Sequence, residues 1–518
     1  MGETTIHRRR NKLNAIGDGP GLGDAYETTL ERIKAQEGEK AKLAMTALMW
    51  ICHSERPLQI NELCHALAVE IGSTHFNNDN VPGAETVLAC CQGLVTVDKE
   101  ASTARLAHHT LREYLSTYRD LFPRAHSEIA ETCLTYLNSD KAKALPAKPQ
   151  PDLSSMPFLK YCSRYWGIYA KRELSDRAVL LAMKLLDQYE NHVAANSLFE
   201  QILDPNEDSP EVNAPSLFGG LHCASFFGIV EVMTGLLGIS GCDANQGDSA
   251  GITPLAWAVR SGQGDAVELL LRQKVVNPDK PDNSGKTPLS WAAIGGYELV
   301  VKQLLGREDV SPNKPDNEGR TPLLLAAIGG HESVVKQLLG QRNVNPDKPD
   351  DEGITPLSWA AMKGHESVVG QLLDREDVNP SKPDNKGRTP LSWAANGGHE
   401  LIVKQLLDRQ DVNPTKPDKN GHIPLWHASI MGHEGAVDLL RAWKPPLAPR
   451  AYPVALTFFF DALHLCLLGY SLLLGLQISY TCNWSDFQKI GYCMITGKPP
   501  GYLIPRSSEE FRVSVTGG

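Results

Sequence analysis

A short motif that recurs at a fixed interval constrains this chain more than any other feature. A Thr-Pro pair followed by Leu returns along the middle of the sequence, and its prolines recur every 34 residues, at Pro254, Pro288, Pro322, Pro356, Pro390 and Pro424. Ile423 replaces the threonine in the last copy, and a degraded copy at Gly220 precedes the first. A fixed period of this length is typical of proteins built from stacked structural repeats.

Each repeat predicts two short helices and a loop. Thr321 can cap a helix that begins at Pro322, because its hydroxyl accepts a free backbone N–H and proline has none to leave unpaired. The glycine pair 329–330 permits the left-handed turn that ends this helix, and a second helix begins at His331. Helices shorter than roughly 12 residues are unstable alone, so neighbouring repeats must cover each other. The second helix has one apolar face, formed by Val334, Val335, Leu338 and Leu339.

The unit G-x-T-P-L, A-A-x-x-G-H-E, V-V-x-x-L-L resembles the ankyrin repeat. The resemblance spans residues 216–443 as seven repeats and implies a solenoid that binds other proteins. The period of 34 is one residue longer than the usual ankyrin period of about 33. The usual histidine after Thr-Pro-Leu is also replaced, by Ser290, Leu324, Ser358 and Ser392. We expect both departures to alter the loops and not the fold.

The ankyrin resemblance implies that two variable positions in each repeat line a concave, partner-binding face. The first row is the residue before Thr-Pro: Lys286, Arg320, Ile354, Arg388 and His422. The second row is the first residue after Ala-Ala, or after Ala-Ser in the last copy: Ile294, Ile328, Met362, Asn396 and Ile430. A mainly basic row beside an apolar row suits a partner segment with acids next to aliphatic residues. The alternative is a solvated edge with no ligand.

Two further sets of residues recur with the repeat, a histidine ladder and a tryptophan ladder, and both are interpreted as structural. His331, His365, His399 and His433 each begin the second helix of a different repeat. A metal needs ligands that converge within about 2 Å of one point, so we expect no metal site and interpret these histidines as stabilising turns. The tryptophans of the first helices are expected to pack between repeats: Trp257, Trp291, Trp359 and Trp393.

The chain before the repeats predicts helices, a hairpin and a further helix, which is the order of a winged-helix domain. A helix is expected over residues 26–48 and another from Thr110 to Tyr118. The runs ALMWICHSERPLQINELCHALAVE (47–70), CQGLVTVD (91–98) and RLAHHTLREYL (105–115) resemble the winged helix that follows the NACHT ATPase domain in fungal NACHT–ankyrin proteins. The resemblance implies the C-terminal portion of an NLR-like protein.

Charge and motifs argue against several functions. The net charge is −10, and no Lys or Arg lies between Pro57 and Asp98, which argues against nucleic acid as a partner. The resemblance would allow His108 or His109 to contact a nucleotide. However, the chain has no G-x-x-x-x-G-K-[ST] motif, so we expect no cofactor and interpret both histidines as capping or packing residues. No nucleophile–base signature appears either, and the sequence predicts no catalytic residues, no enzyme activity and no small-molecule substrate.

Composition and the C-terminal tail bear on location. The cysteines are scattered without C-x-x-C pairs and no secretory signal opens the chain, which indicates a cytoplasmic protein with reduced thiols. Residues 462–485 contain no Asp, Glu, Lys or Arg. This segment is interpreted in three alternative ways: a single membrane anchor at 454–480, a hydrophobic helix on the last repeat, or a poorly ordered extension unrelated to the repeats.

The sequence therefore predicts a mainly α protein in which a winged-helix domain and a helical connector precede an ankyrin solenoid. The expected parts are 1–40, a tail and a helix resembling the end of a NACHT region; 41–120, winged helix; 121–210, connector; 216–443, repeats; and 444–518, a hydrophobic extension. We expect a non-catalytic scaffold that captures a protein ligand. The alternatives are a regulatory fragment of a NACHT-type NTPase switch and a membrane-anchored ankyrin adaptor.

Overall fold

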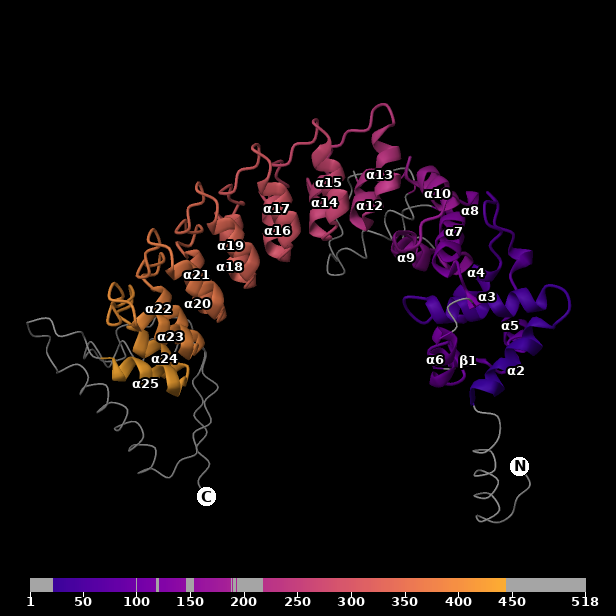
Figure 1. Ribbon diagram of the computed structural model, residues 1–518, viewed down its shortest axis with the longest axis horizontal. Helices are drawn as coiled ribbons and strands as arrows, with labels where there is room; N and C mark the ends of the chain where they lie inside the picture. Colours follow the sequence, from indigo (N-terminus) through magenta and orange to yellow (C-terminus); the bar gives the residue numbers. More distant parts are fainter. Residues whose placement is uncertain are drawn as a thin grey trace, which may run out of the picture. The chain divides into compact units, whose positions relative to one another are not determined.

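The computed structural model describes residues 22–98, 100–117, 121–145, 153–187, 189, 192 and 218–443. Within these residues the fold is mainly α, as the sequence predicts, and the sheet that they contain has two strands. The successive helix pairs of the repeats follow one another in chain order (Figure 1). The C-terminal extension, with the proposed anchor at 454–480, lies outside the described residues.

The N-terminal part has the winged-helix order of elements. Its elements are α2 (Leu22–Lys34), α3 (Lys40–His53), α4 (Ile60–Leu67), α5 (Ala84–Cys90), β1 (Val95–Asp98), β2 (Thr103–Leu106) and α6 (His109–Thr117), with the short 3-10 turn η1 (Asn78–Asn80) before α5. The strands pair antiparallel from Val95 opposite Leu106 to Asp98 opposite Thr103. The chain entering α4 joins this hairpin, because the amide of Ala104 donates to the Leu58 carbonyl.

One predicted helix is two helices in the structure. The expectation of a continuous helix over residues 26–48 is wrong, because α2 ends at Lys34 and α3 begins at Lys40. Gly38 in the intervening turn has a φ of +64°, which a non-glycine residue would adopt only with strain. The turn lets α2 fold back on α3, and the two helices pack together.

The connector consists of α7 (Ala125–Leu137), α8 (Asp140–Lys143), the 3-10 turn η3 (Leu153–Ser155), α9 (Leu159–Arg172) and α10 (Asp176–Leu186). It shares an aromatic core with the winged helix, where the Trp50 ring centroid lies 5.4 Å from that of Phe158. The hydroxyls of Tyr161 and Tyr169 lie 2.6 Å apart. Tyr169 also donates to the carbonyl of His53 at 3.0 Å, so the end of α3 is tied to α9.

The connector also packs against the first repeat. Helix α10 contacts both helices of that repeat, α12 and α13, and α9 contacts α12. A Cβ at Gly220 would lie 2.0 Å from the Leu186 carbonyl oxygen, which shows how closely α12 approaches the end of α10. The last connector helix, α10, therefore covers the N-terminal face of the first repeat.

The repeats each contain two helices joined by a tight turn. They are α12 (Gly220–Phe227) and α13 (Val230–Leu237), α14 (Pro254–Arg260) and α15 (Gly264–Arg272), α16 (Pro288–Gly295) and α17 (Glu298–Leu305), α18 (Pro322–Gly329) and α19 (Glu332–Leu339), α20 (Pro356–Lys363) and α21 (Glu366–Leu373), α22 (Pro390–Gly397) and α23 (Glu400–Leu407), and α24 (Pro424–Ile430) and α25 (Glu434–Ala442). The predicted start at Thr-Pro and the predicted end at glycine both hold for α16, α18, α20 and α22.

Capping and apolar burial explain the repeat helices. The Thr321 hydroxyl accepts the Leu324 amide at 3.3 Å, and Gly330 ends α18 with a φ of +70°. First helices pack on the first helices of neighbouring repeats, and second helices pack on second helices. The predicted apolar face of α19 is buried between them: Val334, Val335, Leu338 and Leu339.

The loops between repeats also bond to one another. The amide of Asn317 donates to the Ser284 carbonyl at 3.0 Å, and its side-chain Nδ2 donates to the Asn283 carbonyl at 2.9 Å. The Lys314 ammonium group reaches the Asp279 carbonyl of the preceding loop at 2.8 Å. Since such bonds repeat along the stack, each loop is fixed by the loop before it.

Among the described helices, none combines the length and the apolar character that crossing a bilayer would require.

Candidate partner-binding surface

An aspartate in the loop before each Thr-Pro pair organises the start of the first helix. In the third repeat, Asp282 Oδ1 accepts the backbone amides of Ser284 and Lys286, both at 2.9 Å. The same two-amide arrangement occurs at Asp248, Asp316, Asp350, Asp384 and Asp418. One carboxylate oxygen therefore fixes the turn that places the residue before Thr-Pro.

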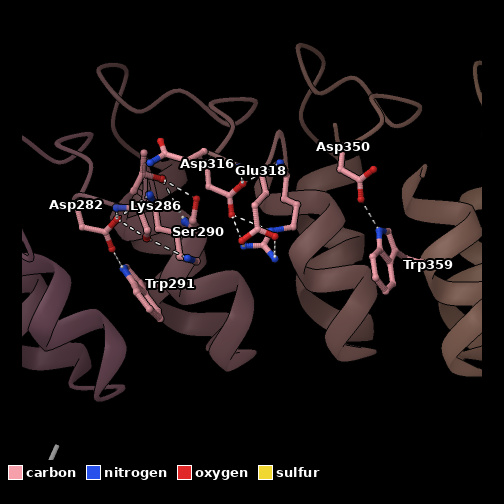
Figure 2. A network of polar contacts seen from close by, with 12 residues as sticks. Asp282, Lys286, Ser290, Trp291, Asp316, Glu318, Asp350 and Trp359 are labelled. Atoms are coloured by element: carbon pink, nitrogen blue, oxygen red, sulfur yellow. Dashed lines mark hydrogen bonds and ion pairs between the residues drawn. The ribbon is translucent and has the colours of Figure 1, made fainter. Parts of the chain in front are cut away.

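The other carboxylate oxygen, Oδ2, takes its donor from different side chains in different repeats. Figure 2 shows Trp291 pointing at Asp282 and Trp359 pointing at Asp350, with indole N–H to Oδ2 distances of 2.9 and 2.8 Å. Trp257 donates to Asp248 in the same way at 2.8 Å. The remaining carboxylates receive Arg320 Nε, Arg388 Nε and His427 Nε2. A buried carboxylate needs such a donor, because its desolvation is otherwise uncompensated.

This carboxylate network engages most of the first predicted row. Arg320 pairs with the buried Asp316 and with the exposed Glu318. Arg388 pairs with Asp384 at 2.9 Å and lies 3.8 Å from the centroid of the Trp393 ring. Both guanidinium groups form ion pairs with an aspartate at the start of their own repeat. Each would have to break that ion pair before it could bind a carboxylate of a partner.

The other members of the first row are also engaged or hidden. Lys286 donates to the Ser284 hydroxyl at 2.9 Å and lies 5.5 Å from the Trp291 ring centroid. His422 stacks on Trp426 with ring centroids 3.6 Å apart. The expectation that Ile354 lines the partner-binding face is wrong, because its side chain is only 2% exposed. In this repeat Trp359 supplies the donor to Asp350, so the residue before Thr-Pro can be apolar and turn inward. Ile354 therefore offers no surface to a partner.

Hydrogen bonds from the following repeat fix the backbone of the second predicted row. The imidazole Nε2 of His331 donates to the carbonyl of Ile294, 2.8 Å away in the preceding repeat. His365, His399 and His433 make the same bond to Ile328, Met362 and Asn396, at 3.0, 3.1 and 3.1 Å. The histidine ladder therefore joins consecutive repeats, and each ring stabilises the turn that ends the preceding first helix.

The side chains of the second row face solvent to different degrees. Ile294 and Ile430 are 37% and 39% exposed, and Ile328, Met362 and Asn396 are half-buried. Each lies in the last turn of a first helix, next to the glycine turn. Because the histidine bonds hold the carbonyls of Ile294, Ile328, Met362 and Asn396, the side chains can differ without altering the fold.

Two more members of the second row were missed by the sequence analysis. Phe226 and Arg260 occupy the same place in the first two repeats, 34 residues apart and 34 before Ile294. These two repeats depart most from the motif, since the first has no Thr-Pro pair and the second reads Ala-Val where most others read Ala-Ala. The 34-residue register alone would have located them. The row thus begins with an aromatic and a cationic residue.

The tryptophan ladder has two roles rather than the single predicted one. Trp257 packs across repeats, since its ring centroid lies 5.9 Å from that of Phe226. The Arg260 guanidinium lies 5.0 Å from the Trp257 centroid and 4.9 Å from the Trp291 centroid, bridging two repeats. Three of the four indoles also serve as donors inside their own repeats. Trp393 differs, because its Nε1 is buried with no hydrogen-bond partner among the described residues.

The histidines of the winged helix lie at a helix start. His108 Nδ1 is 2.7 Å from the Thr110 hydroxyl, which belongs to the first turn of α6. His108 and His109 are both exposed, with ring centroids 4.3 Å apart. This geometry agrees with the capping interpretation. In the part of the chain that the structure describes, no three His, Cys, Asp or Glu side chains gather as a metal site would require.

Comparison with known families matches both parts of this architecture. A family model described as ankyrin repeats (3 copies) matches residues 221–316, 297–384 and 376–445. A model described as the winged-helix domain of GPI inositol-deacylase matches residues 30–130.

A curated relative matches over a shorter stretch. The azaphilone pigments biosynthesis cluster protein L of Monascus ruber is 26% identical over 163 residues, which cover 28% of this chain and 34% of that protein. The chain thus spans about a third of that relative's length. The period, the helix pairs and the two family matches lead to one conclusion: this protein carries an array of ankyrin repeats preceded by a winged-helix domain of the GPI inositol-deacylase type.

Proposed function

We propose that this protein is a non-catalytic scaffold that captures another protein through the second row of the ankyrin array. The observation that carries the proposal is that the backbone and the side chains of this row have different roles. The backbone is fixed by the histidine bonds in repeat after repeat, while the side chains vary and face solvent. A rigid surface with variable side chains suits recognition, because little conformational entropy is lost on binding.

The chemistry of the row suggests the kind of partner. Ile294, Ile328 and Met362 form an aliphatic stretch over three consecutive repeats, and Ile430 follows after the polar Asn396. Partly exposed aliphatic side chains in a row suit an apolar stripe on a partner segment. In this proposal the first row contributes less, since Arg320 and Arg388 form ion pairs with aspartates of their own repeats.

We propose a packing role for the winged helix, in a cytoplasmic protein of the fungal NLR-like type. The buried face of α3 includes Trp50, which contacts connector aromatics, and Tyr169 holds the end of that helix. The region from Pro57 to Asp98 has no cationic side chain to hold a phosphate backbone. These features favour a domain that supports the connector over one that reads DNA.

The test compares two exposed aliphatic residues of one repeat. Ile294→Asp changes the second row, whereas Leu299→Asp changes the start of α17, where Leu299 is 74% exposed. We expect the full chain to capture its partner from cell extract, and Ile294→Asp to weaken that capture by about tenfold or more, as for a central interface residue. Leu299→Asp should have little effect.

Quantitative mass spectrometry of the captured proteins, followed by titration of the enriched partner, provides the measurement. A second row variant, Ile328→Asp, should act in the same direction. Equal loss with Leu299→Asp, or full capture by both row variants, would remove the second row as the binding surface.

A further inference from the structure

A cavity opens where the connector meets the first two repeats. Its volume is about 850 Å³, which lies within the range of roughly 300–1,000 Å³ of ligand pockets. The walls come from α9, from the end of α12, and from the end of α14 with the turn that follows it. The cavity therefore lies at the start of the second row, and both Phe226 and Arg260 line it.

The walls of the cavity are fixed by close packing. A Cβ at Gly167 would lie 2.2 Å from the Phe227 ring, so only glycine lets α9 approach α12 this closely. The Trp166 and Phe227 ring centroids lie 5.2 Å apart. Gln263 donates to the Phe226 carbonyl at 3.1 Å and joins the turn after α14 to the end of α12. The cavity is thus formed by rigid elements rather than by a single loop.

The lining of the cavity is cationic. Arg164, Lys171, Arg172 and Arg260 line it, and neither Asp nor Glu does among the described residues. Arg172 pairs with Glu55. The other three have no carboxylate partner in the described part of the chain, although the chain as a whole carries a net charge of −10. A cluster of unpaired cations in an acidic protein attracts an anionic ligand.

Aromatic rings lie between these cations. Arg164 lies 5.5 Å from the Tyr165 ring centroid, and Arg260 lies over Trp257, while Lys171 donates to the neutral side chain of Gln263. Stacking on a ring holds a guanidinium in place and leaves its N–H donors free for a carboxylate. Phe226 and Tyr165 are half-buried and add apolar surface beside those donors.

We propose that this cavity binds an acidic peptide segment of a partner protein, with carboxylates at Arg164, Lys171 and Arg260 and an aromatic side chain against Phe226 and Tyr165. The proposal rests on the proposed function, because Phe226 and Arg260 belong to the second row. It adds which side chains the partner presents along that row. The partner segment carries acidic and aromatic side chains at the cavity and aliphatic side chains over the later repeats.

The experiment uses the full chain and a fluorescent synthetic peptide that alternates Glu with Tyr, followed by fluorescence anisotropy. We expect saturable binding that weakens with added salt and that is lost when the peptide's Glu residues are replaced by Gln. Arg164→Glu and Arg260→Glu should each weaken binding by about fivefold, since both cations are exposed and each substitution replaces an attraction with a repulsion. The control is Arg272→Glu, an exposed arginine of α15 outside the cavity that pairs with Glu268.

The inference is overturned if the Glu and Gln peptides bind with equal affinity, if Arg272→Glu weakens binding equally, or if inorganic phosphate displaces the peptide as effectively as unlabelled peptide does. Amide substitutions at Asp204, Glu207, Asp208 and Glu211, which the structure does not describe, should leave the affinity unchanged. Tighter binding by that variant would mean that the chain's own acidic segment occupies the cavity, and would overturn the assignment to a partner.

The two proposals fail separately. If Arg164→Glu leaves both peptide binding and partner capture intact while Ile328→Asp abolishes capture, the row is the binding surface and the cavity inference is wrong. If Arg164→Glu abolishes peptide binding and capture while the row variants have no effect, the cavity inference stands and the row assignment fails.

Discussion

At the scale of single residues, the loop aspartate of each repeat explains why the side chains around it vary from repeat to repeat. Asp282 and Asp316 have the same place in their repeats, yet one receives an indole N–H and the other a guanidinium. Either donor satisfies the same oxygen. Variation at the residue before Thr-Pro therefore reflects at least in part which donor the repeat uses, and need not reflect partner specificity.

A pair of tryptophan substitutions tests this interpretation. Trp291→Phe removes the donor to Asp282 and should lower the free energy of unfolding by about 1 kcal/mol more than Trp393→Phe, which removes an indole N–H that has no partner among the described residues. Both substitutions shorten a half-buried ring that lies under a cationic side chain, so the hydrogen bond is the main difference between them. Urea denaturation followed by circular dichroism measures it. Equal losses would show that the carboxylate does not need the indole.

At the scale of elements, the turn between the two helices of a repeat fits the next repeat. Gly364 ends α20 with a φ of +81°, and a Cβ there would lie 2.6 Å from the His399 ring of the following repeat. The ring needs this space to reach the Met362 carbonyl. One glycine thus serves a left-handed turn and an inter-repeat hydrogen bond.

Two glycines of one repeat should respond to alanine with opposite sign. Gly364→Ala should lower the free energy of unfolding by about 1–3 kcal/mol, through backbone strain and displacement of His399. Gly370→Ala lies within α21 with open space around its Cβ position and should raise stability by about 0.5–1 kcal/mol, because alanine favours helix. Thermal and urea denaturation measure both. A stabilising Gly364→Ala would contradict the packing described for the turn.

At the scale of the whole described molecule, the winged helix, the connector and the repeats share a continuous buried core. Neutral histidines occur along its length. Burial lowers the pKa of His65 in the winged helix, His126 and His192 around the connector, and His222 and His427 in the repeats. His222 accepts the Gly219 amide at Nδ1 and donates from Nε2 to the Gln246 carbonyl, so a second proton would break the first bond.

These lowered pKa values predict a loss of stability on acidification. Since the folded pKa lies below the unfolded value of about 6.5, the unfolded chain takes up protons first as the pH falls, and the free energy of unfolding decreases below that pH. His222→Asn can keep the bond from the Gly219 amide without titrating. Its loss of stability between about pH 7.5 and about pH 5.5 should be smaller than that of the unsubstituted protein. Urea denaturation at both pH values measures the difference, and an unchanged loss would exclude His222 as a contributor.

The sequence alone determined the helix pairs, because their signals are local and repeated. Thr321 and Gly330 mark the ends of one helix by capping chemistry, and the apolar spacing of Val334 and Leu338 marks the buried face of the next. The break between α2 and α3 was missed, since a single glycine inside a helical pattern is usually tolerated.

Tertiary structure alone decided which side chains are free. The burial of Ile354 and the engagement of Arg320 depend on which donor reaches the loop aspartate, and the repeat period does not encode that geometry. The cavity joins Arg164 to Arg260 across 96 residues of sequence, through the packing of α9 on α12. The physical reason is that capping and periodicity act within a few residues, whereas exposure and charge pairing depend on neighbours that only the packed stack supplies.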